Sequence, residues 1–111
     1  MIASIVIFVS FNCLESFAQV SYQRLLRAES EPANWLTYSG SYRSQRYSPL
    51  NQVNTQNVNQ LKQAWVYQIR QAGVVESTPL VADGVMYITE PVRAVTALDV
   101  RTGRPLWTYS P

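Results

Sequence analysis

The stretch "ALDVRTGRPLWTYS", residues 97–110, decides the fold. It consists of two short runs of strand-forming residues separated by the break 101–103, which ends in a glycine. Aliphatic, β-branched and aromatic residues favour strands, whereas glycine favours tight turns. We therefore predict that Asp99 and Gly103 shape a turn between two antiparallel strands. Trp107 is expected to project its ring from the outer strand onto a neighbouring sheet.

The same alternation of strand-like runs and breakers extends toward the N-terminus. Five runs rich in Val, Ile, Tyr, Thr and Trp are predicted to be strands: 61–69, 78–82, 85–90, 94–100 and 105–110. Asp83 and Gly84 are predicted to form a two-residue hairpin, because such turns need positive φ at both central positions. Residues 78–110 therefore read as four antiparallel strands in sequence, a meander with the width of one propeller blade.

An internal echo supports a repeat architecture. The pattern Trp-x-Tyr occurs at Trp65 to Tyr67 and again 42 residues later at Trp107 to Tyr109. Propeller repeats are about 40–45 residues long. The two patterns are therefore predicted to occupy equivalent strands of adjacent blades in an all-β protein.

The segment before the strands has a different character. Residues 34–54, "NWLTYSGSYRSQRYSPLNQVN", keep neither a strand period nor a helix period. They are predicted to form an ordered loop pinned by four aromatic side chains, Trp35, Tyr38, Tyr42 and Tyr47. Asn54 or Thr55 is expected to cap a short helix that runs through Leu61.

Composition limits what the chain can do alone. With 111 residues, 47% of them hydrophobic and 14% charged, it has the length of one small globular domain. The net charge is +2, and the basic residues are scattered, so no nucleic-acid surface is predicted. Arg43 and Arg46 among the loop aromatics are too few basic residues to bind single-stranded nucleic acid. Histidine is absent, which removes the usual general base.

Residues 1–18 are predicted to be a secretory signal peptide, although no basic residue occurs before the apolar run. That run, residues 5–11, is too short to span a bilayer, and the small residues Ser16 and Ala18 suit cleavage before Gln19. The alternative is a buried strand or helix. Cys13, the only cysteine, would leave with the leader. Residues 19–33 are expected to be a polar lead-in, and no stable membrane span is predicted.

The pattern Ala97-x-Asp99-x-x-Thr102-Gly103-x-x-x-Trp107 resembles the tryptophan docking motif of the eight-bladed quinoprotein dehydrogenases, with arginine where lysine is usual after the glycine. Residues 34–69 are similar to that family's amino-terminal segment and residues 75–91 to its first blade. The resemblance implies an amino-terminal fragment of an eight-bladed β-propeller over 34–111. It contains one outer strand and one four-stranded blade at about 76–110.

The resemblance also implies an activity. Members of the quinoprotein dehydrogenase family are periplasmic enzymes that oxidise an alcohol, or in related branches a sugar, and pass electrons to a cytochrome or quinone. They use pyrroloquinoline quinone (PQQ) with a calcium or lanthanide ion. Glu76 matches the family's glutamate that hydrogen-bonds this cofactor. No catalytic residue or metal ligand is expected in these 111 residues, so the chain alone is predicted to be inactive.

Other interpretations of the same residues stay open. Glu76 could be a solvated carboxylate ahead of an edge strand, and Glu90 and Asp99 are interpreted as surface and turn residues. The chain could belong to a non-catalytic propeller that serves as a scaffold in the cell envelope, or be a short independent β protein. Cysteine pairs and further docking motifs downstream would favour the enzyme.

Overall fold

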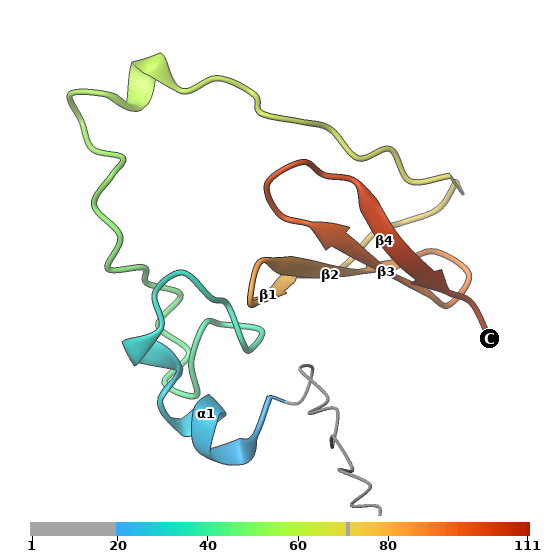
Figure 1. Cartoon of the computed structure of the whole chain (residues 1–111), viewed down its shortest axis with the longest axis horizontal. Helices are drawn as coiled ribbons and strands as arrows, with labels where there is room; N and C mark the ends of the chain where they lie inside the picture. The colour runs from blue at the N-terminus through green and yellow to red at the C-terminus, as the bar shows by residue number, and fades with distance from the viewer. Residues whose placement is uncertain (1–19, 71) are drawn as a thin grey trace, which may run out of the picture.

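The computed structural model describes residues 20–70 and 72–111, so the predicted leader at 1–18 lies outside them (Figure 1). A short helical region comes first, a long extended stretch follows, and the sheet occupies the C-terminal third. The elements are α1 (Tyr22–Leu26), two 3₁₀ turns (Ala28–Ser30 and Val58–Gln60), β1 (Leu80–Ala82), β2 (Val85–Glu90), β3 (Ala94–Asp99) and β4 (Pro105–Tyr109).

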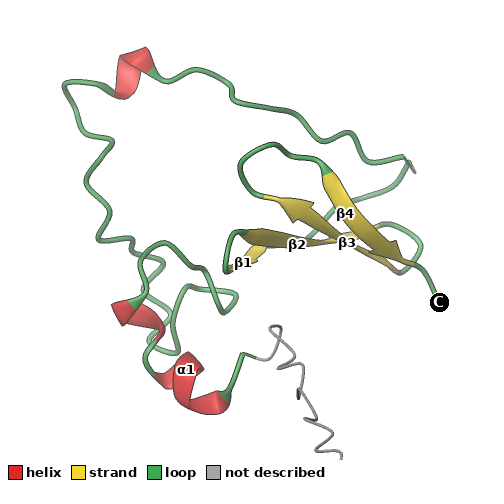
Figure 2. Cartoon of the chain, viewed as in Figure 1, coloured by secondary structure: helices red, strands yellow, loops and turns green. Residues whose placement is uncertain are grey.

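The four strands form one antiparallel sheet in the order β1-β2-β3-β4, which confirms the predicted meander (Figure 2). β2 and β3 pair over their whole length, from Val85 opposite Asp99 to Glu90 opposite Ala94. β1 pairs only with the first half of β2. The second half of β2 therefore continues past the point where β1 begins.

Both predicted turns are confirmed. Asp83 and Gly84 have φ values of 53° and 80°, as a two-residue hairpin requires. In the turn between β3 and β4, one carboxylate oxygen of Asp99 accepts hydrogen bonds from the N–H of Arg101 and from both the N–H and the hydroxyl of Thr102, at 2.8–3.1 Å. These bonds, the hydroxyl first, lower the pKa of Asp99. Its ionised form therefore holds the turn.

The core lies on β3. Ala94, Thr96, Ala97 and Leu98 are all buried in this central strand. β4, at the edge of the sheet, is exposed along its whole length. Trp107 keeps 49% of its surface exposed and packs on one side against Tyr87, with the ring centroids 6.0 Å apart. A sheet with one buried strand and an exposed apolar edge has room for a packing partner.

The strand predicted at 61–69 is wrong as a hydrogen-bonded element. Residues 62–70 and 72–79 make no backbone hydrogen bond to any residue that the structure describes. Burial nevertheless alternates as in a strand: Trp65, Tyr67 and Ile69 are half-buried, and the residues between them are exposed. The residue types favour an extended backbone, but a strand also needs a neighbour to pair with.

The helix predicted to begin at Asn54 or Thr55 is a single 3₁₀ turn, Val58–Gln60, with Asn57 at its cap position. Two side-chain contacts explain its shortness: the Asn54 side chain accepts a hydrogen bond from the N–H of Gln56, and the Asn57 side chain accepts one from the N–H of Asn54. Such local bonds compete with helix formation.

Of the four aromatic residues expected to pin the loop, Trp35 attaches it to the sheet and Tyr38 braces it internally through Arg46. The backbone N–H and C=O of Trp35 pair with the backbone of Val81 in β1, at 2.8 and 3.0 Å. Trp35 thereby adds one paired residue at the β1 edge of the sheet. Tyr38 is exposed, but its hydroxyl accepts a hydrogen bond at 3.0 Å from the Arg46 guanidinium, which also lies 5.0 Å over its ring. Tyr42 and Tyr47 are exposed. Tyrosine can keep its hydroxyl in water, so the pattern alone does not separate anchors from surface rings.

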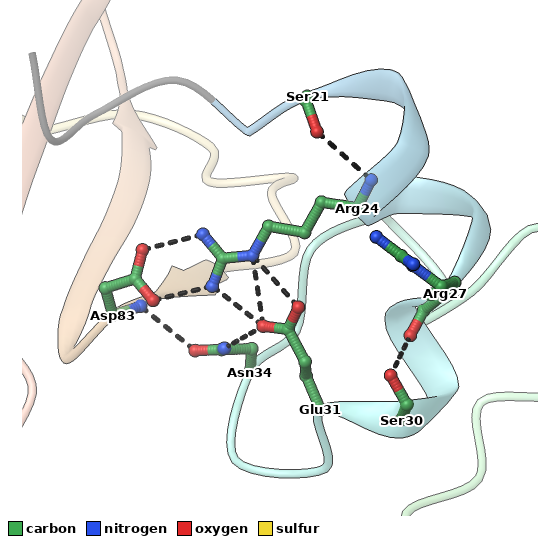
Figure 3. Close-up of polar contacts among 7 residues, drawn as sticks. All are labelled: Ser21, Arg24, Arg27, Ser30, Glu31, Asn34 and Asp83. Atoms are coloured by element: carbon green, nitrogen blue, oxygen red, sulfur yellow. Dashed lines mark hydrogen bonds and ion pairs between the residues drawn. The ribbon is translucent and has the colours of Figure 1, made fainter.

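The polar lead-in contains a helix, α1, that was not predicted. Ser21 caps α1 by accepting a hydrogen bond from the N–H of Arg24, and the Arg24 guanidinium then reaches two carboxylates, Glu31 and Asp83 (Figure 3). The contact with Asp83 is bidentate, at 2.6 and 2.7 Å. Asn34 completes the cluster by accepting from the N–H of Asp83.

These contacts hold the lead-in against the hairpin between β1 and β2. The hydrogen bonds from Arg24 lower the pKa of both Glu31 and Asp83, and the two carboxylates together raise the pKa of Arg24. Because both acidic pKa values are lowered, the cluster's contribution is present at neutral pH and is lost as pH falls through the folded-state pKa values.

Candidate cofactor-binding end of the sheet

Glu76 lies in the extended connection that leads into β1. Its side chain is exposed and forms no hydrogen bond or ion pair with another residue in the described ranges 20–70 and 72–111. Both carboxylate oxygens are therefore available to accept hydrogen bonds. The structure brings none of the other acidic residues singled out from the sequence, Glu90 and Asp99, to this carboxylate.

The strand directions define which end of the sheet Glu76 occupies. In an antiparallel meander the start of β1, the end of β2 and the start of β3 share one end. The turn 91–93 between β2 and β3 therefore lies at the end of the sheet from which the connection 72–79, which contains Glu76, enters β1 (Figure 1). The turns at 83–84 and 100–104 lie at the opposite end.

Glu90 organises the end of β2, which corrects its interpretation as a surface residue. Its carboxylate is half-buried and accepts hydrogen bonds from the Tyr67 hydroxyl, at 2.9 Å, and from the Thr96 hydroxyl. Thr96 is fully buried and also bonds the Thr108 hydroxyl of β4 at 2.9 Å. Burial first, and then the bond to Glu90, raises the pKa of Tyr67. Tyr67 therefore stays a hydroxyl donor at neutral pH.

Pro91, the residue after Glu90, contacts the connection that carries Glu76. A Cβ placed on Gly73 would lie 2.8 Å from the Cβ of Pro91, so only glycine permits this approach. Val92 and Arg93 follow with φ values of 62° and 66°, which close the turn tightly. Gly73 had no signal in the sequence beyond its residue type, because its need for close packing depends on a partner 18 positions away.

At the opposite end, Trp65 docks on the turn between β3 and β4. Its indole N–H donates to the carbonyl of Val100 at 3.0 Å, and its ring covers Gly103. Gly103 is buried and has φ 68°. The sequence motif drew attention to Trp107, but the tryptophan that contacts this turn is the equivalent one in the preceding Trp-x-Tyr pattern.

The resemblance implies PQQ as the cofactor and Glu76 as the residue that contacts it. A free carboxylate such as that of Glu76 can accept hydrogen bonds or bind a hard cation. Within 20–70 and 72–111, no three His, Cys, Asp or Glu side chains gather as a metal site. A pocket of about 220 Å³ lies elsewhere, between the lead-in and the aromatic loop. Glu76 thus fits one contact to PQQ, and the described residues supply no complete site.

Comparison with known proteins identifies the architecture. Residues 35–111 match the family model of the glucose/ethanol/alcohol dehydrogenase β-propeller domain that is named for PQQ. The chain belongs to this PQQ propeller family. Its four-stranded antiparallel sheet is accordingly a propeller blade, as predicted. No helix in the part of the chain that the structure describes is long and apolar enough to cross a membrane.

Two relatives and two solved structures show the degree of similarity. Over 94 residues the chain is 48% identical to the quinohemoprotein alcohol dehydrogenase ADH-IIG of Pseudomonas putida, covering 85% of this chain and 13% of the relative. The solved structure of that type from Pseudomonas putida HK5 has a TM-score of 0.79, at 49% identity, covering 83% of this chain and 14% of its own.

The 1-butanol dehydrogenase (cytochrome c) of Thauera butanivorans is 47% identical over 77 residues, 69% of this chain and 11% of the relative. A europium-containing methanol dehydrogenase structure has a TM-score of 0.73 at 35% identity, covering 80% of this chain and 16% of its own. The chain thus spans a small part of the length of each PQQ-family protein that it matches.

Proposed function

We propose that this chain supplies the amino-terminal blade, and with it Glu76, to a PQQ-dependent dehydrogenase that oxidises an alcohol or a sugar. The observation that carries the proposal is the match of residues 35–111 to the PQQ family, combined with a free carboxylate at the entry to β1. The relatives named above act on alcohols, and one is named for cytochrome c. Transfer of electrons to a cytochrome or quinone belongs to the same proposal.

In this role the chain helps to bind and orient the cofactor, and it does not carry out the proton transfer. Glu76 accepts a hydrogen bond from the cofactor through its free carboxylate, and the blade behind it holds the connection in place. PQQ, when bound, takes up the electrons of the alcohol, and a calcium or lanthanide ion acts as the Lewis acid. The base and the ligands of that ion belong to residues outside this chain.

The role of Glu76 can be tested in a chimera in which residues 20–111 replace the matching segment of the Pseudomonas putida relative. Glu76→Gln should lower PQQ retention by roughly tenfold, because a hydrogen bond to a charged group contributes about 1.5–3 kcal/mol. Absorbance of the bound quinone after dialysis measures this. Glu29→Gln, an exposed carboxylate on the lead-in, is the matched control and should retain PQQ. Equal retention by the two variants would reject the assignment.

We further propose export to the periplasm with removal of residues 1–18. The apolar run at 5–11 and the small residues Ser16 and Ala18 support this. Intact-mass measurement on protein from a periplasmic fraction should show a chain beginning at Gln19. Recovery of the unprocessed chain from the cytoplasm would contradict the proposal.

A further inference from the structure

We infer that Glu90 and Pro91, two adjacent residues at the end of β2, are positioning residues for the connection that carries Glu76. The inference rests on the proposed function of Glu76 and adds the residues that hold it. Neither Glu90 nor Pro91 is proposed to contact the cofactor. Both act on the chain that leads up to Glu76, Glu90 at Tyr67 and Pro91 at Gly73.

The first contact holds the chain before the connection. The extended segment 65–69 makes no backbone hydrogen bond to a described residue, so side chains attach it to the blade. Trp65 fixes it at one end of the sheet by bonding Val100, and Tyr67 fixes it nearer the other end by bonding Glu90. Because Tyr67 is the anchor nearer to Glu76 along the chain, the Glu90 contact sets where the connection begins.

Thr96 and Thr108 make Glu90 a firm acceptor. The Thr96 hydroxyl donates to the same carboxylate oxygen as Tyr67, and Thr96 itself bonds Thr108 across the strand pair. The chain of hydroxyls thus ties Glu90 to β3 and β4. A carboxylate that receives two hydrogen bonds in a half-buried site has little freedom to turn away.

The second contact holds the middle of the connection. Gly73 lies so close to Pro91 that any side chain at 73 would overlap the proline ring. From Gly73 the chain reaches β1 at Leu80, where backbone pairing with Tyr87 begins. Glu76 therefore lies on a short span between two fixed points, and its reach is limited by the extended length of that span.

The test uses the chimera and two measurements. Trypsin cleavage after Arg70, an exposed residue between the two contacts, reports opening of the segment. Tyr67→Phe removes one hydrogen bond and should speed this cleavage roughly fivefold. Glu90→Leu strips both hydroxyls of their acceptor and should speed it more than tenfold. Glu90→Gln keeps an amide oxygen as acceptor, so its cleavage should be nearly as slow as in the unchanged protein.

PQQ retention supplies the second measurement. Tyr67→Phe should weaken retention in the Glu76 protein and have no further effect in a Glu76→Gln background, because its effect passes through Glu76. Arg24→Gln, which removes a contact at the opposite end of the sheet, is the control and should change neither the cleavage after Arg70 nor the retention of PQQ.

The outcomes separate this inference from the proposed function. Unchanged cleavage after Arg70 in both Tyr67→Phe and Glu90→Leu would overturn the positioning role. Equal loss of PQQ from Tyr67→Phe with and without Glu76 would overturn it as well, because the effect would then bypass Glu76. If Glu76→Gln alone leaves retention unchanged, the proposed function of Glu76 fails, whereas faster cleavage would still support positioning of the connection.

Discussion

Replacing Gly103 with alanine should speed hydrogen exchange of the turn between β3 and β4 about 100-fold in the chimera. Gly103 has φ 68°, and an added Cβ would overlap the six-membered ring of Trp65, with Trp65 Cγ also only 2.9 Å away. A left-handed backbone costs a residue other than glycine about 1–2 kcal/mol, and displacing Trp65 loses its bond to Val100, about 1 kcal/mol more. About 3 kcal/mol corresponds to this change in rate. Exchange of the Gly103 amide, bonded to Asp99, is the measurement.

The chain offers a matched control for this prediction. Gly84 has φ 80°, but nothing lies within 4 Å of a Cβ placed on it. Gly84→Ala should therefore show only the backbone effect, a change of roughly fivefold to thirtyfold in the exchange of its own turn. In a Trp65→Ala background, Gly103→Ala should fall to the same size. If Gly103→Ala and Gly84→Ala were equal from the start, docking of Trp65 on the turn would not contribute.

The second large effect concerns the chain by itself. We expect the 111-residue protein to melt over a broad temperature range, bind a hydrophobic dye and self-associate, whereas the chimera melts sharply. Among the described residues, the buried hydrophobic side chains are few and mostly small: Ala28, Leu36, Ala94, Ala97 and Leu98. Leu106 and Trp107 of the edge strand are half-exposed. A core of this size does not offset the conformational entropy of ordering the chain.

Differential scanning calorimetry and light scattering measure this prediction, and a dye-reduction assay with alcohol, PQQ and calcium accompanies them. We expect no turnover, because the described residues hold a single proposed cofactor contact. A monodisperse monomer with a sharp two-state transition would contradict the stability argument. Alcohol-dependent dye reduction by the isolated chain would contradict the assignment of the chemistry to residues outside it.

Features of this fold that depend on interactions between neighbouring residues could be predicted from the sequence, whereas features that depend on distant contacts could not. The four strands of the sheet and the hairpin at Asp83 and Gly84 follow from residue type, because β-branched residues, breakers and positive-φ turns act over a few neighbouring positions. The same holds for the turn at Asp99, whose side chain bonds groups two and three residues ahead. Membership of the PQQ family was likewise readable from local motifs.

Tertiary contacts decided the rest. Residues 61–69 have the composition of a strand, but they dock through Trp65 and Tyr67, and residues 62–69 make no backbone hydrogen bond to a described residue. Nothing in its neighbours distinguishes Glu90 from a surface carboxylate until Tyr67, 23 positions away, bonds it.

Arg24 shows the same limit. It reaches Asp83 across 59 positions, and this contact places the lead-in against the first hairpin. Sequence alone determined which segments are extended and where the chain turns, because those preferences are local. Which polar side chain becomes an anchor depended on folding, because only folding removes its water and brings a distant partner into hydrogen-bonding distance.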